Sequence, residues 1–309
     1  MNGCDRGTAL ELALHGTDAA LFDSAARLRQ AAFGRRVELC AIINARSGNC
    51  GMDCRFCSQS RHNSTGVAVF PLLPDAELAE RTARLADSPV RHIGLVTSGG
   101  ALEGGEFVRL RDFIASCPDG VRRKLCASLG RLSQGQLEAL HAAGLPRFHH
   151  NLETAESYYP NICTTQRWQD RRTTARRARA AGLELCCGGL FGLGESWEDR
   201  VDFALALREE GVRNVPLNFL HPHPHTPLGG RPPLDAAEAL RIIAVFRHIL
   251  PQATLRVCGG RPLVLGGRQA DIFAAGANAL MTGDYLTTRG GGLEDDIRMI
   301  QAQGLEIAE

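Results

Sequence analysis

Three cysteines, Cys50, Cys54 and Cys57, lie within eight residues in the segment NCGMDCRFCS (49–58). Close groups of thiolates bind zinc or iron–sulfur clusters. Structural zinc normally takes four ligands, whereas this segment offers one isolated C-x3-C-x2-C group. Three thiolates on a four-iron cluster leave one iron free to bind a substrate or cofactor. The spacing therefore predicts a [4Fe–4S] cluster held by these three cysteines.

The chain contains eleven cysteines in 309 residues. The N-terminal segment lacks the basic-then-apolar plan of a signal peptide, and the cysteine count is odd, so a disulfide framework is not expected. Free cysteine packs well in protein cores. We therefore interpret Cys4, Cys40 and Cys117 as buried small hydrophobic residues.

Short apolar runs alternate with amphipathic stretches, and these elements must position the cysteine loop. Strands are predicted over 38–45, 92–98, 124–129, 147–152, 184–192, 214–220, 254–259 and 278–286. Helices are predicted over 18–33, 74–88, 104–116, 132–143, 168–181, 196–211, 235–249, 266–276 and 293–303. Eight strand–helix pairs indicate an α/β fold with a closed (β/α)8 barrel of the TIM type, with an open doubly wound sheet as the alternative. We expect one domain over 1–309, with a helical extension over 1–35 and the barrel over 36–305.

The chemistry of a TIM barrel takes place at the carboxyl ends of its strands. Unusual residues of this chain fall at that end of successive predicted strands, and we expect them to converge. They are the cysteine loop, the Ser98-Gly99-Gly100 turn, Cys126, the His149-His150-Asn151 group, Cys186 with Cys187, Asn218 and Arg256.

The charge balance excludes some classes of partner. The chain has 35 basic and 34 acidic residues and a formal net charge of +1. This balance gives no reason to expect nucleic acid or an anionic membrane as the main partner. No apolar run reaches the ~18 residues that a membrane span requires. We predict a cytoplasmic protein.

The cysteine loop, with Phe56 before its last cysteine, resembles the signature of the radical S-adenosylmethionine (SAM) superfamily. In that superfamily the open iron binds SAM, and an electron from the cluster releases a 5′-deoxyadenosyl radical. Two further segments resemble its SAM-binding motifs. They are TSGG (97–100), with Ser98, Gly99 and Gly100 at the methionyl amine, and GGLFGLGE (188–195), with Gly192 and Glu195 near adenine.

Long segments between residues 35 and 305 resemble the biotin synthase family, including 43–60, 126–145, 148–166 and 215–230. The resemblance implies a sulfurtransferase that converts dethiobiotin to biotin with two SAM per turnover and an auxiliary iron–sulfur cluster as sulfur donor. It also implies a flavodoxin- or ferredoxin-type electron donor and a homodimer. The alternatives are another sulfur insertase of this fold, such as a lipoyl synthase, and a non-catalytic iron–sulfur protein.

Several site residues follow from this resemblance. Asn151 and Glu153 match positions that contact substrate and the SAM ribose, although the second is usually Asp. Asn218 matches the residue at the ureido ring, where a carboxamide supplies both a donor and an acceptor. The resemblance further implies that Arg171 lies near the SAM carboxylate and that Thr287 and Thr288 receive the substrate carboxylate.

The auxiliary cluster departs from the family pattern of three cysteines and one arginine around [2Fe–2S]. Cys126, Cys186 and Arg256 match three of these four positions, but Thr97 stands at the remaining cysteine position. We therefore hypothesise an altered cluster, either [2Fe–2S] or of a four-iron type, on Cys126, Cys163 and Cys186. The fourth ligand would come from Cys258, Cys187 or His150, and core packing is the alternative role for the added thiols.

Overall fold

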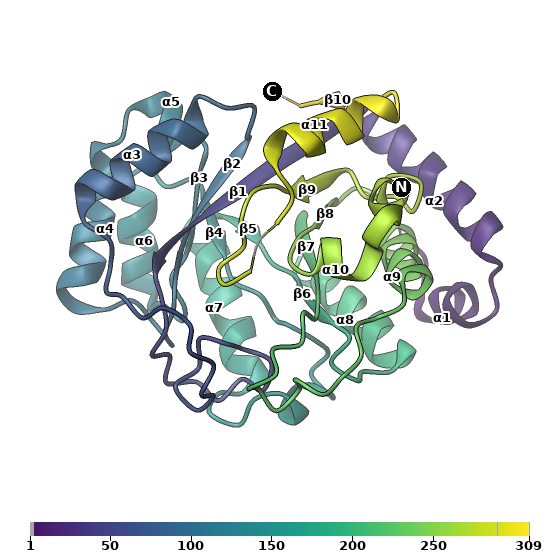
Figure 1. The fold of residues 1–309 in the computed structure, drawn as a ribbon, viewed down its shortest axis with the longest axis horizontal. Coiled ribbons are helices and arrows are strands. Elements are labelled where there is room, and N and C mark those ends of the chain that lie inside the picture. The colour runs from purple at the N-terminus through teal and green to yellow at the C-terminus, as the bar shows by residue number, and fades with distance from the viewer. Residues whose placement is uncertain (1–2, 289, 309) are drawn as a thin grey trace.

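The computed structural model describes residues 3–288 and 290–308, and its centre is a barrel of parallel strands with helices outside (Figure 1). The barrel order is β1-β2-β3-β4-β5-β7-β8-β9, and pairing of β1 with β9 closes it. The strands are β1 Arg36–Arg46, β2 His92–Thr97, β3 Leu125–Ser128, β4 Arg147–His149, β5 Glu184–Cys186, β6 Gly189–Phe191, β7 Asn214–Phe219, β8 Thr254–Val257, β9 Ala279–Met281 and β10 Glu306–Ile307. The closed barrel predicted from the strand–helix alternation is confirmed.

Helices cover the outside of the barrel (Figure 1). The first two helices of the chain, α1 and α2, pack beside α8 and α9. The α-helices are α1 Arg6–Leu14, α2 Asp18–Phe33, α3 Asp75–Ala86, α4 Gly104–Ser116, α5 Asp119–Arg122, α6 Gln134–Ala142, α7 Trp168–Ala180, α8 Trp197–Glu209, α9 Ala236–Ile249, α10 Arg261–Leu265 and α11 Leu293–Ala302. Two 3-10 helices, η1 Tyr159–Asn161 and η2 Gly266–Ile272, complete the set.

The sequence prediction differs from the structure at several elements, including the following three. Helix α1 was not predicted; its first turn is capped by the Asp5 carboxylate, which accepts from Thr8 N at 2.8 Å. The predicted helix 266–276 is instead a kinked 3-10 helix, because Gly266 takes φ +50° and ends α10 there. The predicted strand 184–192 is two short strands, β5 and β6.

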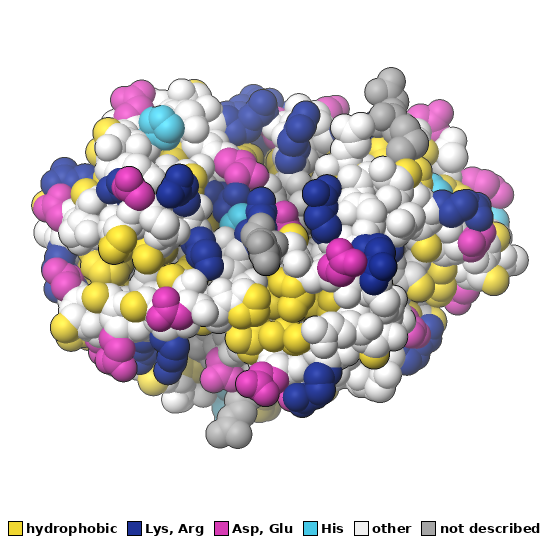
Figure 2. Space-filling view, turned by 90° about the horizontal axis from the view of Figure 1, so that it is seen from above, with side chains coloured by type: hydrophobic (Ala, Val, Ile, Leu, Met, Phe, Trp, Pro, Cys, Tyr) yellow, Lys and Arg dark blue, Asp and Glu magenta, His cyan; other side chains and the backbone are white. Residues whose placement is uncertain are grey.

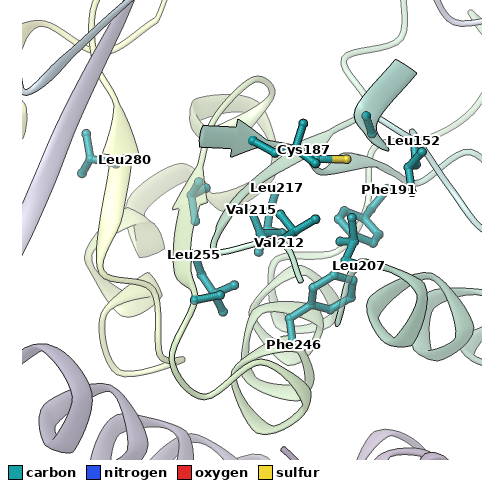
Figure 3. Packing of buried hydrophobic residues seen from close by; sticks show 14 of the residues in the cluster. Leu152, Cys187, Phe191, Leu207, Val212, Val215, Leu217, Phe246, Leu255 and Leu280 are labelled. Atoms are coloured by element: carbon teal, nitrogen blue, oxygen red, sulfur yellow. The ribbon is translucent and has the colours of Figure 1, made fainter. Parts of the chain in front are cut away.

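The break between β5 and β6 sets which way neighbouring side chains face. A Cβ atom at Gly188 would collide with the Pro216 carbonyl, so only glycine fits where the chain bends past β7. Cys187 N donates to Asn214 O at 2.9 Å just before this bend. The Cys187 side chain is fully buried in the hydrophobic core, near Leu152 and Phe191 (Figure 3).

Aromatic packing fixes β6 against the outer helices. The Phe191 ring lies 5.2 Å from the Phe246 ring on α9 and 6.1 Å from the Phe203 ring on α8, measured between centroids. Each buried ring of this size contributes on the order of 2–3 kcal/mol through removal from water. The loop after β6 therefore begins at a strand that is held firmly by its packing against α8 and α9.

The outer surface carries both signs of charge. On the face seen in Figure 2, Lys and Arg side chains are interspersed with Asp and Glu. In the part of the chain that the structure describes, no helix has the length and apolar character needed to cross a membrane.

A charged network fills the amino end of the barrel interior. Arg256 Nη2 donates to Glu38 at 2.9 Å, and Arg147 pairs with His92 Nδ1 at 2.6 Å and with Glu184 at 2.5 Å. Burial would raise the pKa of Glu38, but His92 and Arg256 outweigh it and lower the pKa to about 2. Burial lowers the pKa of His92 to about 4, so the imidazole is neutral near neutral pH. We call this network of Glu38, His92, Arg147, Glu184 and Arg256 the floor network.

Candidate active site

A cavity of about 520 Å³ opens at the carboxyl ends of the strands, above the floor network. Every second residue of a strand faces the same side, and the cavity lining follows that alternation. The lining includes Cys40 and Ile42 of β1, His92, Gly94 and Val96 of β2, Cys126 and Ser128 of β3, and Arg147 and His149 of β4. Of the residues predicted to converge at this end of the barrel, all except Cys187 line the cavity.

The cysteine loop forms one wall at the mouth, with Cys50, Cys54 and Cys57 all lining the cavity. Backbone bonds hold the loop in shape: Cys57 N donates to Cys54 O at 3.0 Å, and Cys50 N donates to Gln59 O at 3.0 Å. The Gln59 side chain is buried and accepts from Gly48 N at 3.0 Å. The three thiols thus lie on one folded loop facing open space.

The donor set fits an iron–sulfur cluster better than a single ion. Among residues 3–288 and 290–308, no three Cys, His, Asp or Glu side chains lie close enough together to hold one metal ion. Burial raises the pKa of Cys57 to about 11, and contact with Cys163 together with burial raises that of Cys54. Thiols of this kind become thiolates by coordinating iron, which releases their protons.

The turn after β2 forms the wall next to Arg131. Gly99 takes φ +114°, a conformation that favours glycine, and Ser98 is held by its hydroxyl, which donates to Gly48 O at 2.7 Å. Gly100 O accepts from Arg131 N at 2.8 Å. The Arg131 side chain lines the cavity, and its buried Nε has no partner within the described residues. Its Nη1 lies 3.9 Å from the Asp170 carboxylate. Sequence analysis missed Arg131, which lies three residues past the end of β3.

Asn151 and Glu153, which follow β4, lie together with Arg171 of α7. Asn151 Nδ2 donates to Glu153 Oε2 at 3.3 Å, and Arg171 Nη1 lies 3.5 Å from Glu153 Oε1. Glu153 has φ +73°, rare for a residue with a side chain, which directs its carboxylate toward the cavity. Burial raises the pKa of Glu153, and the Arg171 charge opposes the shift.

Gly192 and Glu195 lie behind the cavity wall instead of on it. Glu195 accepts from Leu193 N at 2.7 Å and from Gly192 N at 3.0 Å, and it pairs with Arg200 Nε at 2.8 Å. Its side chain is 1% exposed. These residues shape the turn after β6, and among their neighbours it is Leu190 that lines the cavity.

The predicted substrate residues lie at the opposite wall and at the mouth. The Asn218 carboxamide lines the cavity while it donates to Gly189 O at 3.1 Å and accepts from Gly259 N at 3.0 Å. Thr287 and Thr288 line the mouth, and the Thr287 hydroxyl lies 3.0 Å from the Ser58 hydroxyl on the cysteine loop.

A second group of thiols lies deeper, around Arg256. Cys126 and Cys186 line the cavity there, together with Cys40 and Cys258. Burial raises the pKa of Cys186 to about 11, and the Arg256 charge opposes the shift. Burial also raises the pKa of Cys258, the Arg256 charge opposes the shift, and Cys40 and Cys186 add to it.

Cys40 was interpreted from the sequence as a packing residue, but it faces this cavity. Its backbone pairs with His92 of β2 and with Met281 of β9, and both of those side chains also line the cavity. The alternation of inward residues along β1, Cys40 then Ile42, is the signal that could have identified it.

Cys163 and Cys187 lie apart from the deeper thiols. Cys163 Sγ donates to Asp53 Oδ1 at 3.2 Å at the rim, and Cys187 is in the core outside the barrel wall. His150 lines the cavity, stacked on Phe148 with ring centroids 6.2 Å apart. The structure therefore does not bring Cys163 or Cys187 to Cys126 and Cys186.

Comparison with known proteins agrees with this arrangement. Residues 45–207 match the model described as Radical SAM superfamily, and residues 216–306 match the Biotin and Thiamin Synthesis associated domain. The fold covers 99% of this chain and 94% of methylornithine synthase (PylB) with a TM-score of 0.83 at 19% identity. The [FeFe]-hydrogenase maturase HydG matches with a TM-score of 0.83 at 15% identity, over 99% of this chain and 72% of that one. Barrel, cysteine loop and family model together define a radical SAM protein.

Two curated relatives identify the family of this chain within the radical SAM class. Biotin synthase of Desulfovibrio desulfuricans is 65% identical over 287 residues, which cover 93% of this chain and 91% of that protein. Biotin synthase of Nitratidesulfovibrio vulgaris is 49% identical, over 90% of this chain and 79% of that protein. The chain belongs to the biotin synthase family. The resemblance found in the sequence, and with it the prediction of a sulfurtransferase of this family, is confirmed.

Proposed function

We propose that this protein inserts sulfur into dethiobiotin to form biotin, with two SAM consumed per turnover. The observation that carries the proposal is one cavity with a thiol trio at its mouth, a second thiol group near its floor, and polar side chains between them. When bound, the two clusters and SAM would supply the electron, the radical and the sulfur.

Each part of the cavity has a proposed role. Cys50, Cys54 and Cys57 would hold the [4Fe–4S] cluster. The Ser98–Gly100 turn, Phe56 and the Asn151–Glu153–Arg171 group would bind SAM, and the tight contacts of Arg171 keep the Glu153 carboxylate in place. Asn218, Thr287 and Thr288 would orient dethiobiotin so that its reacting carbons face the deeper thiols.

We propose that Cys40, Cys126, Cys186 and Cys258 hold the auxiliary cluster beside Arg256. This set leaves out Cys163 and Cys187, which were hypothesised from the sequence as ligands. Cys163 lies at the rim of the cavity and Cys187 lies in the hydrophobic core. Four thiols can hold either a [2Fe–2S] or a four-iron cluster, and they make an arginine ligand unnecessary. Arg256 donates to Glu38 through its Nη2 atom. The buried Nε of the same side chain has no partner among the described residues and would be available to donate to a cluster sulfide.

We also propose a cytoplasmic homodimer that receives electrons from a flavodoxin- or ferredoxin-type donor, as in the family. We treat the chain as a single domain with a helical extension over 1–35. In support, residues from both family models contribute strands to one closed sheet.

The test is anaerobic reconstitution followed by iron and sulfide analysis, Mössbauer spectroscopy and mass-spectrometric detection of biotin from dethiobiotin. A Cys50/Cys54/Cys57→Ala variant should keep the auxiliary cluster and make no biotin. Cys40→Ala and Cys258→Ala should keep the first cluster and lose iron from the second. Cys117→Ala is the matched control, since that thiol lies at the carboxyl end of α4, outside the cavity lining, and donates to Phe113 O. If the triple variant holds no iron and the wild type cleaves SAM without forming biotin, the proposal fails.

A further inference from the structure

Two chain segments run antiparallel to each other at the rim of the cavity. One is the cysteine loop and the other follows η1. Arg55 N donates to Ile162 O at 2.9 Å, and two residues earlier the Asp53 side chain accepts from Thr164 N at 2.9 Å. Cys54 and Cys163 lie between these two sets of bonds, directly opposite each other.

This placement brings two thiols close together. One backbone bond and one bond to the Asp53 side chain flank the pair and hold the two segments side by side, and a disulfide needs Cα atoms within about 7 Å of each other. The Cys163 sulfur also lies 3.2 Å from the side chain of Asp53, the residue before Cys54, and both cysteines are free. Their residues are 8% and 3% exposed, so bulk solvent does not compete for the contact. Cys163 is therefore a thiol beside Cys54 that does not belong to the cluster trio.

We propose that Cys54 and Cys163 form a reversible disulfide whenever the [4Fe–4S] cluster is lost, and that this bond protects the cluster loop. The inference rests on the cluster site proposed above. Hydrogen peroxide, the oxidant we name, accepts two electrons and two protons from the thiol pair and leaves as two waters. A dithiol reductant reverses the step and frees Cys54 for a new cluster.

The chemical advantage lies in what the bond prevents. A cysteine oxidised to sulfenic acid with no thiol beside it proceeds to sulfinic and sulfonic acids, which are not reduced back in most proteins. A thiol already in contact captures the first oxidation product as a disulfide. Reducing compartments keep such disulfides transient, as a protective device requires.

The experiment uses the full-length protein after chelator removal of its iron. Wild type, Cys163→Ser and the control Cys117→Ser are treated with one equivalent of hydrogen peroxide, digested without reduction and analysed by mass spectrometry. We expect a Cys54–Cys163 peptide pair in the wild type and the control. After treatment with excess peroxide, dithiothreitol and reconstitution, both should regain their starting iron content. Cys163→Ser should regain less than half of it and carry sulfinic or sulfonic acid at Cys54.

Two results would overturn the inference: linkage of Cys54 to Cys50 or Cys57 in the wild type, or recovery of Cys163→Ser equal to that of wild type. Cys163→Ala repeats the test where Ser disturbs the rim. The readouts are disulfide mapping and iron content, not biotin formation. A protein that maps the disulfide but makes no biotin would sink the proposed reaction and leave this inference standing.

Discussion

The Nδ1 atom of His149 lies 3.5 Å from the sulfur of Cys186, inside the barrel. Burial lowers the pKa of His149 to about 4, so the ring is neutral and its Nδ1–H can donate to a Cys186 thiolate. Hydrogen bonds to ligand sulfurs raise the reduction potential of iron–sulfur clusters.

We therefore expect His149→Ala to lower the midpoint potential of the auxiliary cluster by about 40 mV, the one-electron equivalent of about 1 kcal/mol for a hydrogen bond. Redox titration of the Cys50/Cys54/Cys57→Ala background isolates that cluster. His141→Ala, an exposed histidine on α6, is the control. An unchanged potential would remove His149 from the cluster environment.

Arg131 is expected to add affinity for the SAM carboxylate. Its side chain lines the cavity beside the Gly100 turn. The Asp170 carboxylate is 3.9 Å away, too far for a hydrogen bond, so the guanidinium is available to bind a carboxylate in the cavity. A hydrogen bond to a charged group is worth about 1.5–3 kcal/mol, so Arg131→Ala should weaken SAM binding at least tenfold. Equilibrium dialysis with the reconstituted protein measures this. Arg123→Ala, exposed just before β3, should bind as the wild type does; equal affinities in both variants would contradict the assignment.

Glu210 is expected to make the free energy of unfolding depend on pH in the acid range. Burial would raise the pKa of Glu210, but hydrogen bonds from Arg176 and Arg172 of α7 outweigh it and lower the pKa below its ordinary value of 4.5. The carboxylate therefore stabilises the fold above pH 4.5, and that contribution is lost as the pH falls through the lowered pKa. Urea unfolding of the apoprotein should show Glu210→Gln less stable by about 2 kcal/mol at pH 7, with a smaller difference at pH 4.

The matched control for that measurement is Glu209→Gln. The Glu209 side chain is 70% exposed and lies 3.4 Å from Arg172. Exposed pairs contribute about 0–1 kcal/mol, so this variant should unfold as the wild type does at both pH values. A Glu210→Gln penalty that grew toward low pH would refute the electrostatic explanation.

Glycine at the β5–β6 bend should be indispensable. A Cβ at Gly188 would meet the Pro216 carbonyl, and the backbone there is locked between β4 and β7. We expect Gly188→Ala to lower thermal stability by 3 kcal/mol or more, on the order of a severe overpacking change. Gly135→Ala, in α6 with open space around it, should be neutral or stabilising by about 0.5–1 kcal/mol. Calorimetry of both apoproteins distinguishes them, and similar melting temperatures would contradict the expectation.

The sequence predicted the barrel and the mouth of the site well because those signals are local. Strand–helix alternation gives the barrel, and the spacing of Cys50, Cys54 and Cys57 gives the thiol trio. Glu195 shows the limit of a motif: its position in GGLFGLGE was right for the turn, but its carboxylate caps backbone N–H groups behind the wall. A motif fixes neighbours along the chain and leaves the direction of a side chain open.

The deeper thiols were harder to predict because they depend on register between distant strands. Cys40 and Cys258 are more than two hundred residues apart in the sequence. They come to the same height in the barrel because β1 pairs with β9 and β9 pairs with β8. Cys163 was assigned to this group from its place after β4. The chain turns at η1 and carries Cys163 back to the rim, a path set by backbone hydrogen bonds that no local pattern reveals.

Among the described residues, the floor network fills the amino end of the barrel. Glu38, His92 and Arg147 are largely buried and bonded to one another, so small molecules are not expected to pass between the strands at that end. In the proposed reaction the barrel would then be loaded in order. The auxiliary cluster would be installed first, and its sulfur would be renewed only after product and cofactor have left by the mouth.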